Sequence, residues 1–220
     1  MQIFKKHFKN FISNYKDIVE LPSDINFKNI KKISTDTRTL LKNDIFIALK
    51  GENFNGDNFL KDAIKKHAKL CISEKKHKKT ITVKSTSNFL RDFSKYIIEK
   101  NPKIKTIGIT GTNGKTTTKE MVNSIIKQKF RTHCTKGNYN NQIGLPLTIM
   151  EMNSKTEYLI LEMGTNSLGE IEILADIARP QISTITNIGK GHTEKLKNKK
   201  TIFKEKFNII KRFDKNSTFI

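Results

Sequence analysis

A chain of 220 residues, 35% of them hydrophobic and 29% charged, is long enough to bury the core of one large domain or two small ones. Its apolar runs are far shorter than a membrane span, and its N-terminus does not resemble a secretory signal. The net charge of +21 comes from 37 Lys and only 5 Arg. Nucleic-acid sites favour Arg with interleaved aromatic side chains, so this scattered Lys charge predicts no nucleic-acid partner.

The two cysteines, Cys71 and Cys134, have neither metal-ligand spacing nor the pattern of a disulfide framework. A cytoplasmic protein without membrane insertion is therefore expected. Residues 1–11 mix lysines with Ile3, Phe4 and Phe8, which predicts a short amphipathic helix.

Residues 33–100 form the predicted first unit. Runs of β-forming residues indicate strands at residues 44–49, 70–73 and 81–83, and apolar side chains at helical spacing indicate helices at residues 58–68 and 85–100. Asn101-Pro102-Lys103 ends the last helix, because proline disfavours helix at the residue before it. We therefore expect an N-terminal domain at residues 1–102 and a central domain at residues 103–220.

From residue 104 the pattern changes to strand, loop and helix, repeated. Strands are expected at residues 104–110, 157–162, 181–189 and 217–220, and helices at residues 169–178 and 201–210. Another helix should follow the first strand and bury Met121, Val122, Ile125 and Ile126. This alternation predicts right-handed βαβ units and a parallel sheet, and hence an α/β fold.

The segment TGTNGKTT, at residues 110–117, joins a predicted strand to a predicted helix. Gly111 and Gly114 let the backbone turn so that its N–H groups converge on phosphate oxygens, and the helix adds its positive N-terminal end. Lys115 would neutralise the β- and γ-phosphates of a nucleotide, and the Thr116 hydroxyl would bind Mg²⁺. The flanking strand and helix favour this interpretation over a glycine turn with a surface lysine. The predicted phosphate site comprises Thr110, Gly111, Thr112, Asn113, Gly114, Lys115, Thr116 and Thr117.

Two further strand ends should meet this loop, because ligands bind beyond the carboxyl ends of parallel strands. Glu162 closes the strand at residues 157–162, where a carboxylate is either a cation ligand or the first solvated residue. His192 follows the strand at residues 181–189 and is either a metal ligand or a structural histidine. The Asn-rich residues 136–148 form a polar substrate loop or a turn. These features predict an α/β enzyme that uses a Mg²⁺-bound nucleotide.

Several segments occur in the order expected of the Mur ligases, and together the resemblance covers nearly all of residues 33–212. They are ISTDTR, DIFIALKGENFNGDNFL, TGTNGKTTTKEM, GNYNNQIGLPLT, LEMGTNSLGEI and ARPQISTITNIGKGHTEKL. The commoner phosphate loop has a glycine at the position of Ile109, but in the Mur ligases the sequence of this loop is TGTNGKT. EMGTNSLGEI and NIGKGH resemble the branch of the family that adds D-alanyl-D-alanine.

The resemblance implies a P-loop-type, ATP-binding central domain and an ATP- and Mg²⁺-dependent peptide ligase of peptidoglycan synthesis. Its substrates would be UDP-N-acetylmuramoyl-tripeptide and D-alanyl-D-alanine, joined through an acyl phosphate. The implied catalytic residues are Lys115, Lys206 and His192, and the implied metal ligands are Thr116, Glu162 and His192. The implied substrate contacts are Ser34, Thr35, Asp36, Thr37 and Arg38 for the UDP-sugar and Asn138, Asn140 and Asn141 for the muramoyl group. Lys206 matches a lysine that is carbamylated in the family, although Phe207 and Asn208 replace its usual Gly-Glu.

The resemblance also implies a chain of about twice this length, with a third domain for the incoming dipeptide. The central domain is accordingly expected to be incomplete, and these residues alone are expected to ligate little or nothing. Two interpretations stay open. One is a fragment of a working ligase that is monomeric when whole, either of this branch or of another. The other is a truncated or split remnant that binds only nucleotide or UDP-sugar.

Overall fold

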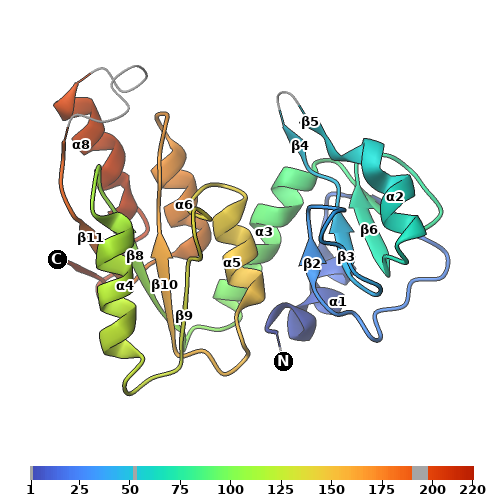
Figure 1. The fold of residues 1–220 in the computed structure, drawn as a ribbon, viewed down its shortest axis with the longest axis horizontal. Coiled ribbons are helices and arrows are strands. Elements are labelled where there is room, and N and C mark those ends of the chain that lie inside the picture. The colour runs from blue at the N-terminus through green and yellow to red at the C-terminus, as the bar shows by residue number, and fades with distance from the viewer. Residues whose placement is uncertain (1, 52–53, 190–197) are drawn as a thin grey trace. The chain divides into compact units, whose positions relative to one another are not determined.

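The structure is a computed structural model that describes residues 2–51, 54–189 and 198–220 (Figure 1). The chain forms two compact units, residues 1–93 and 94–220, which divide within helix α3 (Thr86–Glu99). The domain boundary expected after residue 102 stays a prediction; it lies beyond the end of this helix. No helix in the described part of the chain is both long enough and apolar enough to cross a membrane.

The first unit is built on a five-stranded sheet in the order β1-β7-β6-β3-β2, in which β1 runs antiparallel to β7 and the other neighbours are parallel. The strands are β1 (Ile18–Glu20), β2 (Ile33–Ser34), β3 (Ile45–Ile47), β6 (Leu70–Ser73) and β7 (Thr80–Val83). A separate antiparallel pair is formed by β4 (Lys50–Gly51) and β5 (Phe54–Asn55). The helices are α1 (Phe4–Asn14), the 3-10 turn η1 (Gly56–Phe59) and α2 (Leu60–Lys65).

Aromatic side chains hold α1 in the first unit. The predicted amphipathic helix is present, and its buried face meets the first turns of α3. The ring of Phe8 lies edge-to-face on Phe93, with centroids 5.5 Å apart, and that of Phe11 lies edge-to-face on Phe89, with centroids 5.6 Å apart. Such pairs add to the burial of apolar area and fix the position of the helix.

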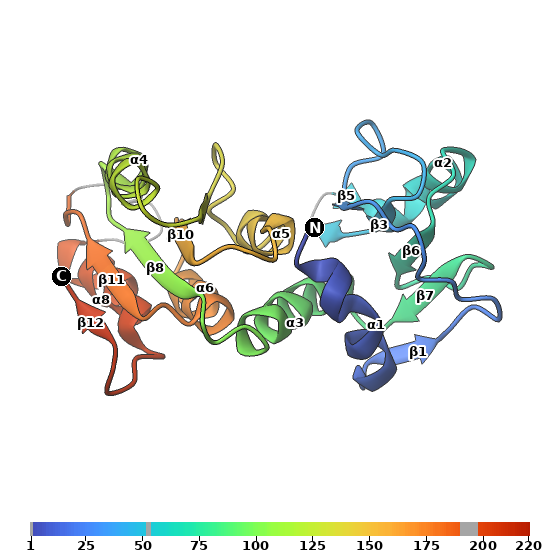
Figure 2. The same ribbon diagram turned by 90° about the horizontal axis from the view of Figure 1, so that it is seen from below.

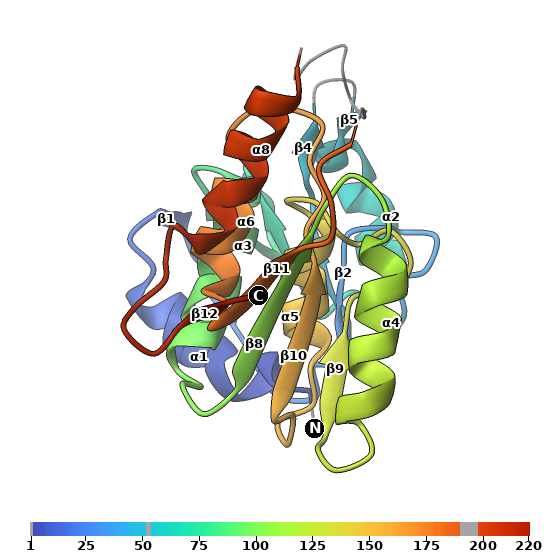
Figure 3. The same cartoon turned by 90° about the vertical axis from the view of Figure 1, so that its left-hand side faces the viewer.

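The second unit is an entirely parallel five-stranded sheet in the order β12-β11-β8-β10-β9 (Figure 3). The strands are β8 (Lys105–Thr110), β9 (Thr132–Cys134), β10 (Tyr158–Glu162), β11 (Ile182–Ile185) and β12 (Thr218–Phe219). The helices are α4 (Lys115–Ile126), α5 (Gly144–Glu151), α6 (Glu170–Ala178), α8 (Lys199–Phe207) and the 3-10 turn η2 (Asn208–Ile210). Helices α4 and α5 cover one face of the sheet, and α6 and α8 cover the other (Figure 2). The α/β class with a parallel sheet is confirmed.

The predicted burial of α4 is wrong at two positions. Met121 is 60% exposed and Ile125 is 69% exposed. The helix turns Val122 and Ile126 toward the core of Ile107, Ile109 and Ile160. Position 119 lies three residues before Val122 and therefore shares this face, and Lys119 is only 1% exposed.

Candidate active site

The predicted phosphate loop lies between β8 and α4. Gly114 has a φ of +78° and precedes the first residue of α4, so the turn enters the helix through a left-handed residue that favours glycine. Gly111 has a φ of +153°, and a Cβ atom built there would lie 1.9 Å from the Thr186 hydroxyl oxygen. Both predicted glycines are therefore required by the backbone path.

The segment that follows β11 holds the phosphate loop. The Thr186 hydroxyl donates to the Asn113 carbonyl at 2.5 Å, and the Asn113 amide donates to the Asn187 side-chain oxygen at 3.0 Å. The Gly189 amide donates to the Thr112 hydroxyl at 3.0 Å. Sequence reasoning missed Thr186 and Asn187. The sequence signal that could have indicated them is their position directly after a predicted strand. In the structure this strand, β11, pairs with β8, which leads into the phosphate loop.

Two lysines converge on one carbonyl oxygen of the loop. The Lys115 ammonium donates to the Gly111 oxygen at 2.9 Å and to the Thr112 oxygen at 3.1 Å. Lys206, from α8, donates to the same Gly111 oxygen at 3.0 Å and is 2% exposed. Burial, and then the positive charge of Lys115, lower the pKa of Lys206 to about 8. The structure thus brings together two of the three predicted catalytic residues.

Glu205 fixes the helix that carries Lys206. Its buried carboxylate accepts the backbone N–H groups of Gly169 and Ile171, at 2.7 and 2.9 Å, at the start of α6. A carboxylate at a helix N-terminus is stabilised by the unpaired N–H groups and by the helix dipole. Glu205 therefore anchors α8 to α6 beside the phosphate loop.

Glu162 links the phosphate loop to the Asn-rich loop. One carboxylate oxygen accepts the Thr116 hydroxyl at 2.8 Å, and the other accepts the Asn140 amide at 2.8 Å. Glu162 is 3% exposed. Its own backbone N–H donates to the Thr135 hydroxyl at 3.0 Å. The two predicted metal ligands that the structure describes, Thr116 and Glu162, are therefore in direct contact.

This arrangement fits a hard divalent cation. Among the described residues, Glu162 forms no ion pair with Lys or Arg, so its buried charge is balanced only by neutral donors. A carboxylate and a hydroxyl oxygen are the ligand types that Mg²⁺ prefers. The third predicted ligand, His192, lies outside the described residues.

A cavity of about 480 Å³ lies beside Lys115. Its lining includes all three predicted muramoyl-facing residues, Asn138, Asn140 and Asn141. Asn141 also has a local role, because its side-chain oxygen accepts the N–H groups of Ile143 and Gly144 at the start of α5. The Asn-rich segment is thus both a turn and a cavity wall.

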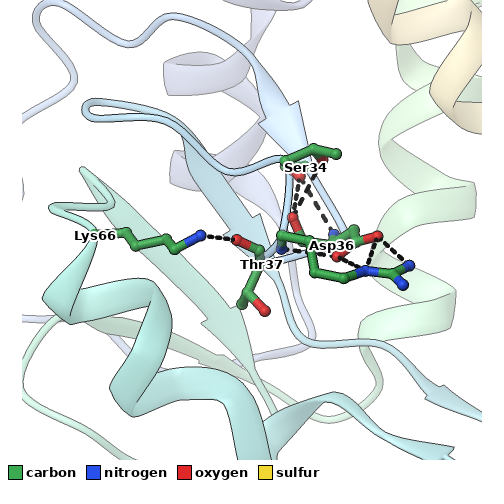
Figure 4. A network of polar contacts seen from close by, with 6 residues as sticks. Ser34, Asp36, Thr37 and Lys66 are labelled. Carbon is green, nitrogen blue, oxygen red and sulfur yellow. Dashed lines mark hydrogen bonds and ion pairs between the residues drawn. The ribbon is translucent and has the colours of Figure 1, made fainter.

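The predicted UDP-sugar residues form a turn at the end of β2 in the first unit (Figure 4). The carboxylate of Asp36 accepts the Arg38 backbone N–H at 2.8 Å and pairs with the Arg38 guanidinium at 2.7 Å. These contacts lower the pKa of Asp36 to about 2, chiefly through the side-chain hydrogen bond. Ser34 is buried, and its hydroxyl donates to the Asp36 carbonyl at 3.0 Å. Lys66 donates to the Thr37 carbonyl at 2.8 Å.

The same turn borders a second cavity, of about 530 Å³. It is lined by Thr35, Asp36, Thr37, Arg38, Phe46, Phe54 and Phe59. The rings of Phe54 and Phe59 stack with centroids 5.5 Å apart, and both side chains are partly exposed. Sequence reasoning missed these aromatic residues, because Phe54 lies in β5 and Phe59 in η1, and no sequence pattern indicates that two rings five residues apart stack.

Comparison with known proteins identifies the family. Residues 109–220 match the Mur ligase middle domain, and residues 29–113 match the Mur ligase family catalytic domain. The chain belongs to the Mur ligase family. The resemblance to the Mur ligases is therefore confirmed.

Two of the curated relatives that the chain resembles carry the same name. The UDP-N-acetylmuramoyl-tripeptide–D-alanyl-D-alanine ligase of Bacillus subtilis is 38% identical over 188 residues, covering 82% of this chain and 41% of the relative. The ligase of that name from Borreliella burgdorferi is 35% identical over 220 residues, covering 89% of this chain and 47% of the relative. The chain thus spans about half the length of these relatives.

Solved Mur ligase structures share the fold. The crystal structure of MurF from Acinetobacter baumannii superposes with a TM-score of 0.84 and 32% identity, over 91% of this chain and 44% of that one. MurF from Thermotoga maritima, solved in complex with ADP, gives a TM-score of 0.78 and 31% identity, over 86% of this chain and 45% of that one.

Proposed function

We propose that this chain carries the nucleotide-binding and UDP-sugar-binding parts of a UDP-N-acetylmuramoyl-tripeptide–D-alanyl-D-alanine ligase. The single observation that carries the proposal is the position of Glu162. One of its oxygens binds Thr116 of the phosphate loop and the other binds Asn140 of the Asn-rich loop. The two substrate loops therefore meet at one buried carboxylate, as a reaction between ATP and a second substrate requires.

In the proposed reaction, the γ-phosphoryl group of ATP is transferred to the terminal carboxylate of the UDP-linked tripeptide, and ADP leaves. The amine of D-alanyl-D-alanine then forms the amide bond, and phosphate leaves. Lys115 and the loop N–H groups would hold the phosphates, whose oxygens would otherwise repel the incoming carboxylate. Thr116 and Glu162, with His192, would hold Mg²⁺, which supplies positive charge to the phosphate oxygens when bound.

The Asp36–Arg38 turn and its cavity would hold the UDP-sugar. Thr35 and Thr37 offer hydroxyl groups to phosphate or sugar oxygens, and the side chain of Arg38 is 88% exposed despite its ion pair. An exposed guanidinium is suited to a diphosphate, which accepts paired hydrogen bonds. ATP and UDP-sugar would thus bind in different units.

Separate binding measurements test this division. Fluorescent ADP with Mg²⁺, and UDP-N-acetylmuramoyl-tripeptide, are titrated into the wild-type chain and into Lys115→Ala. We expect the variant to lose at least about tenfold in ADP affinity while it keeps its affinity for the UDP-linked peptide. Lys127→Ala, at the exposed end of the same helix, is the control and should change neither affinity.

Two results contradict the proposal. Unchanged ADP affinity in Lys115→Ala shows that the loop is not the phosphate site. Binding of ADP but not of the UDP-linked peptide shows that the first unit does not serve this substrate. Salt-sensitive RNA or DNA binding that survives Lys115→Ala would instead reveal a nucleic-acid protein.

A further inference from the structure

Lys119 is a charged residue in the most buried position of α4. Its side chain is 1% exposed on the helix face that packs against the sheet, where an apolar residue is usual. Burying an ammonium group costs free energy even when it is paired, and apolar replacements of buried ion pairs are often neutral or stabilising. The stability of α4 therefore does not explain a lysine at this position.

The partners of Lys119 point toward the metal ligands. Its ammonium donates to the Thr135 carbonyl at 2.7 Å, and it pairs with Glu120 at 2.8 Å. Glu120 is 60% exposed, so this ion pair contributes little. Thr135 directly follows β9, and its hydroxyl accepts the backbone N–H of Glu162. Lys119 thus binds the carbonyl oxygen of Thr135, and the Glu162 amide binds the side-chain hydroxyl of the same threonine.

These contacts close a ring of side chains and backbone. Thr116 and Lys119 lie three residues apart on one face of α4. Thr116 binds the Glu162 carboxylate, Glu162 binds the Thr135 hydroxyl, and the Thr135 carbonyl binds Lys119. The helix that begins at the phosphate loop is therefore fastened to the ends of β9 and β10 by two contacts one turn apart.

We propose that Lys119 is a positioning residue that fastens α4 to Thr135 and thereby sets the Thr116 hydroxyl against the Glu162 carboxylate. The inference rests on the proposed function, because it assumes that these two groups receive Mg²⁺. In the described part of the chain, the Lys119 ammonium binds Thr135 and Glu120 and neither of the two proposed metal ligands. Without Lys119, the start of α4 is joined to the ends of β9 and β10 by the Thr116–Glu162 hydrogen bond and no longer by the Lys119–Thr135 bond. The two proposed metal ligands are then less firmly held against each other.

Amide hydrogen exchange tests the positioning without any nucleotide. In Lys119→Met, which keeps length and removes charge, we expect the Glu162 amide to exchange at least about tenfold faster, because Thr135 keeps the bond from its N–H to the Ile160 carbonyl but loses the one at its own carbonyl. The midpoint of thermal unfolding should stay within a few degrees of the wild type. Lys127→Met, on the exposed end of α4, should leave both values unchanged.

Metal dependence supplies the second measurement. Titration of Mg²⁺ at fixed fluorescent ADP should require about tenfold more Mg²⁺ in Lys119→Met, while ADP affinity without metal stays at the wild-type value. Thr135→Val should reproduce both effects, and Thr135→Ser, which keeps the hydroxyl, should restore wild-type behaviour. This pair tests the ring even where Lys119→Met fails to fold.

The outcomes separate the two proposals. Wild-type exchange and wild-type Mg²⁺ dependence in Lys119→Met and Thr135→Val overturn the positioning role and leave the proposed function intact. Equal loss of unfolding midpoint, exchange protection and metal-free ADP affinity also overturns it, because Lys119 then only stabilises the fold. Absence of ADP binding by the wild type contradicts the proposed function, whereas the exchange experiment still decides whether Lys119 fixes Glu162.

Discussion

The ammonium groups of Lys115 and Lys206 donate to the same acceptor, the carbonyl oxygen of Gly111, at 2.9 and 3.0 Å. One lysine belongs to the phosphate loop, and the other comes from α8 on the opposite face of the sheet. Their mutual repulsion adds to burial in lowering the pKa of Lys206 to about 8. Two positive charges are therefore concentrated where the proposed function requires phosphate groups.

The lowered pKa of Lys206 predicts reactivity toward CO₂. With its pKa lowered to about 8, Lys206 has a far larger neutral fraction at pH 7 than an ordinary lysine. The neutral amine attacks CO₂, an N–C bond forms, and a proton is released to give the carbamate that the family resemblance implies. With ¹³C-bicarbonate, we expect a carbamate ¹³C signal that grows as the pH rises through about 8, because deprotonation then goes to completion.

Lys206→Arg should abolish that signal, and Lys204→Arg, an exposed position on the same helix, should keep it. A carbamate signal of equal size in Lys206→Arg would assign the reaction to another amine.

Lys115→Met tests the electrostatic coupling between the two lysines. Removing the charge of Lys115 should raise the pKa of Lys206 above about 8. The ordinary value should not be reached, because burial is the larger cause of the shift. The pH midpoint of the carbamate signal, or the ¹⁵N shift of the Lys206 ammonium, measures this change. An unchanged midpoint would show that the charge of Lys115 does not reach Lys206.

Much of the second unit could be predicted from the sequence, because its strands and helices alternate and are separated by turn-forming residues. Strands β8 and β10 and helix α6 lie within one residue of their expected bounds. Strand β9 was missed because Thr132–Cys134 is too short to show a pattern. Helix α5 was missed because it follows an Asn-rich run that favours turns. The expected strand at residues 181–189 ends at Ile185, and Thr186 and Asn187, which follow it, bind the phosphate loop through their side chains.

The candidate site could be predicted only where one residue type carries the chemistry. Glu162 ends β10, and Lys115 and Thr116 begin the helix that follows β8, so the parallel sheet brings all three to one edge. Lys119 was not predictable, because periodicity counts apolar residues and a lysine indicates a solvated face. Thr186 and Asn187 reach the loop because β11 pairs with β8. They could not be predicted, because the order of strands in a sheet cannot be inferred from one local segment of sequence.

Gly111→Ala should destabilise the second unit by about 2–4 kcal/mol, because the new methyl group overlaps the Thr186 hydroxyl in a backbone region that disfavours side chains. Denaturant unfolding measures this. Gly169→Ala is the matched control: it has a φ of +85° and open space around it, so only the backbone cost of about 1 kcal/mol applies. Adding Thr186→Ala should recover part of the loss in Gly111→Ala. Equal effects of the two glycine substitutions would rule out the overlap.

Thr116→Val and Thr116→Ser distinguish the contribution of the Thr116 hydroxyl group from that of its branched side-chain shape. Valine keeps the branched side chain but cannot donate to Glu162, so the buried carboxylate loses one of the two side-chain donors found among the described residues. We expect Mg²⁺-dependent ADP affinity to fall at least about tenfold in Thr116→Val and to stay within about twofold of the wild type in Thr116→Ser. Equal affinities in both variants, measured by Mg²⁺ titration, would remove Thr116 from the metal site.

Arg38→Met tests the turn in the first unit. The guanidinium of Arg38 is the main cause of the low pKa of Asp36, so the pKa of Asp36 should rise from about 2 toward the ordinary value in this variant. Because the folded-state pKa lies below the ordinary one, the stabilisation from this pair is present near neutral pH and is lost as the pH falls toward 2. Both groups are exposed, so the unfolding midpoint at pH 7 should not change measurably.

Binding of UDP-N-acetylmuramoyl-tripeptide should nevertheless weaken in Arg38→Met, because the proposed diphosphate contact is lost together with the geometry of the turn. Arg38→Lys keeps the charge but not the paired donors, so its affinity should lie between those of the wild type and Arg38→Met. NMR titration of the Asp36 carboxyl group and calorimetric titration of the UDP-linked peptide measure the two effects. A shifted Asp36 pKa with unchanged affinity would show that the pair shapes the turn but does not contact the substrate.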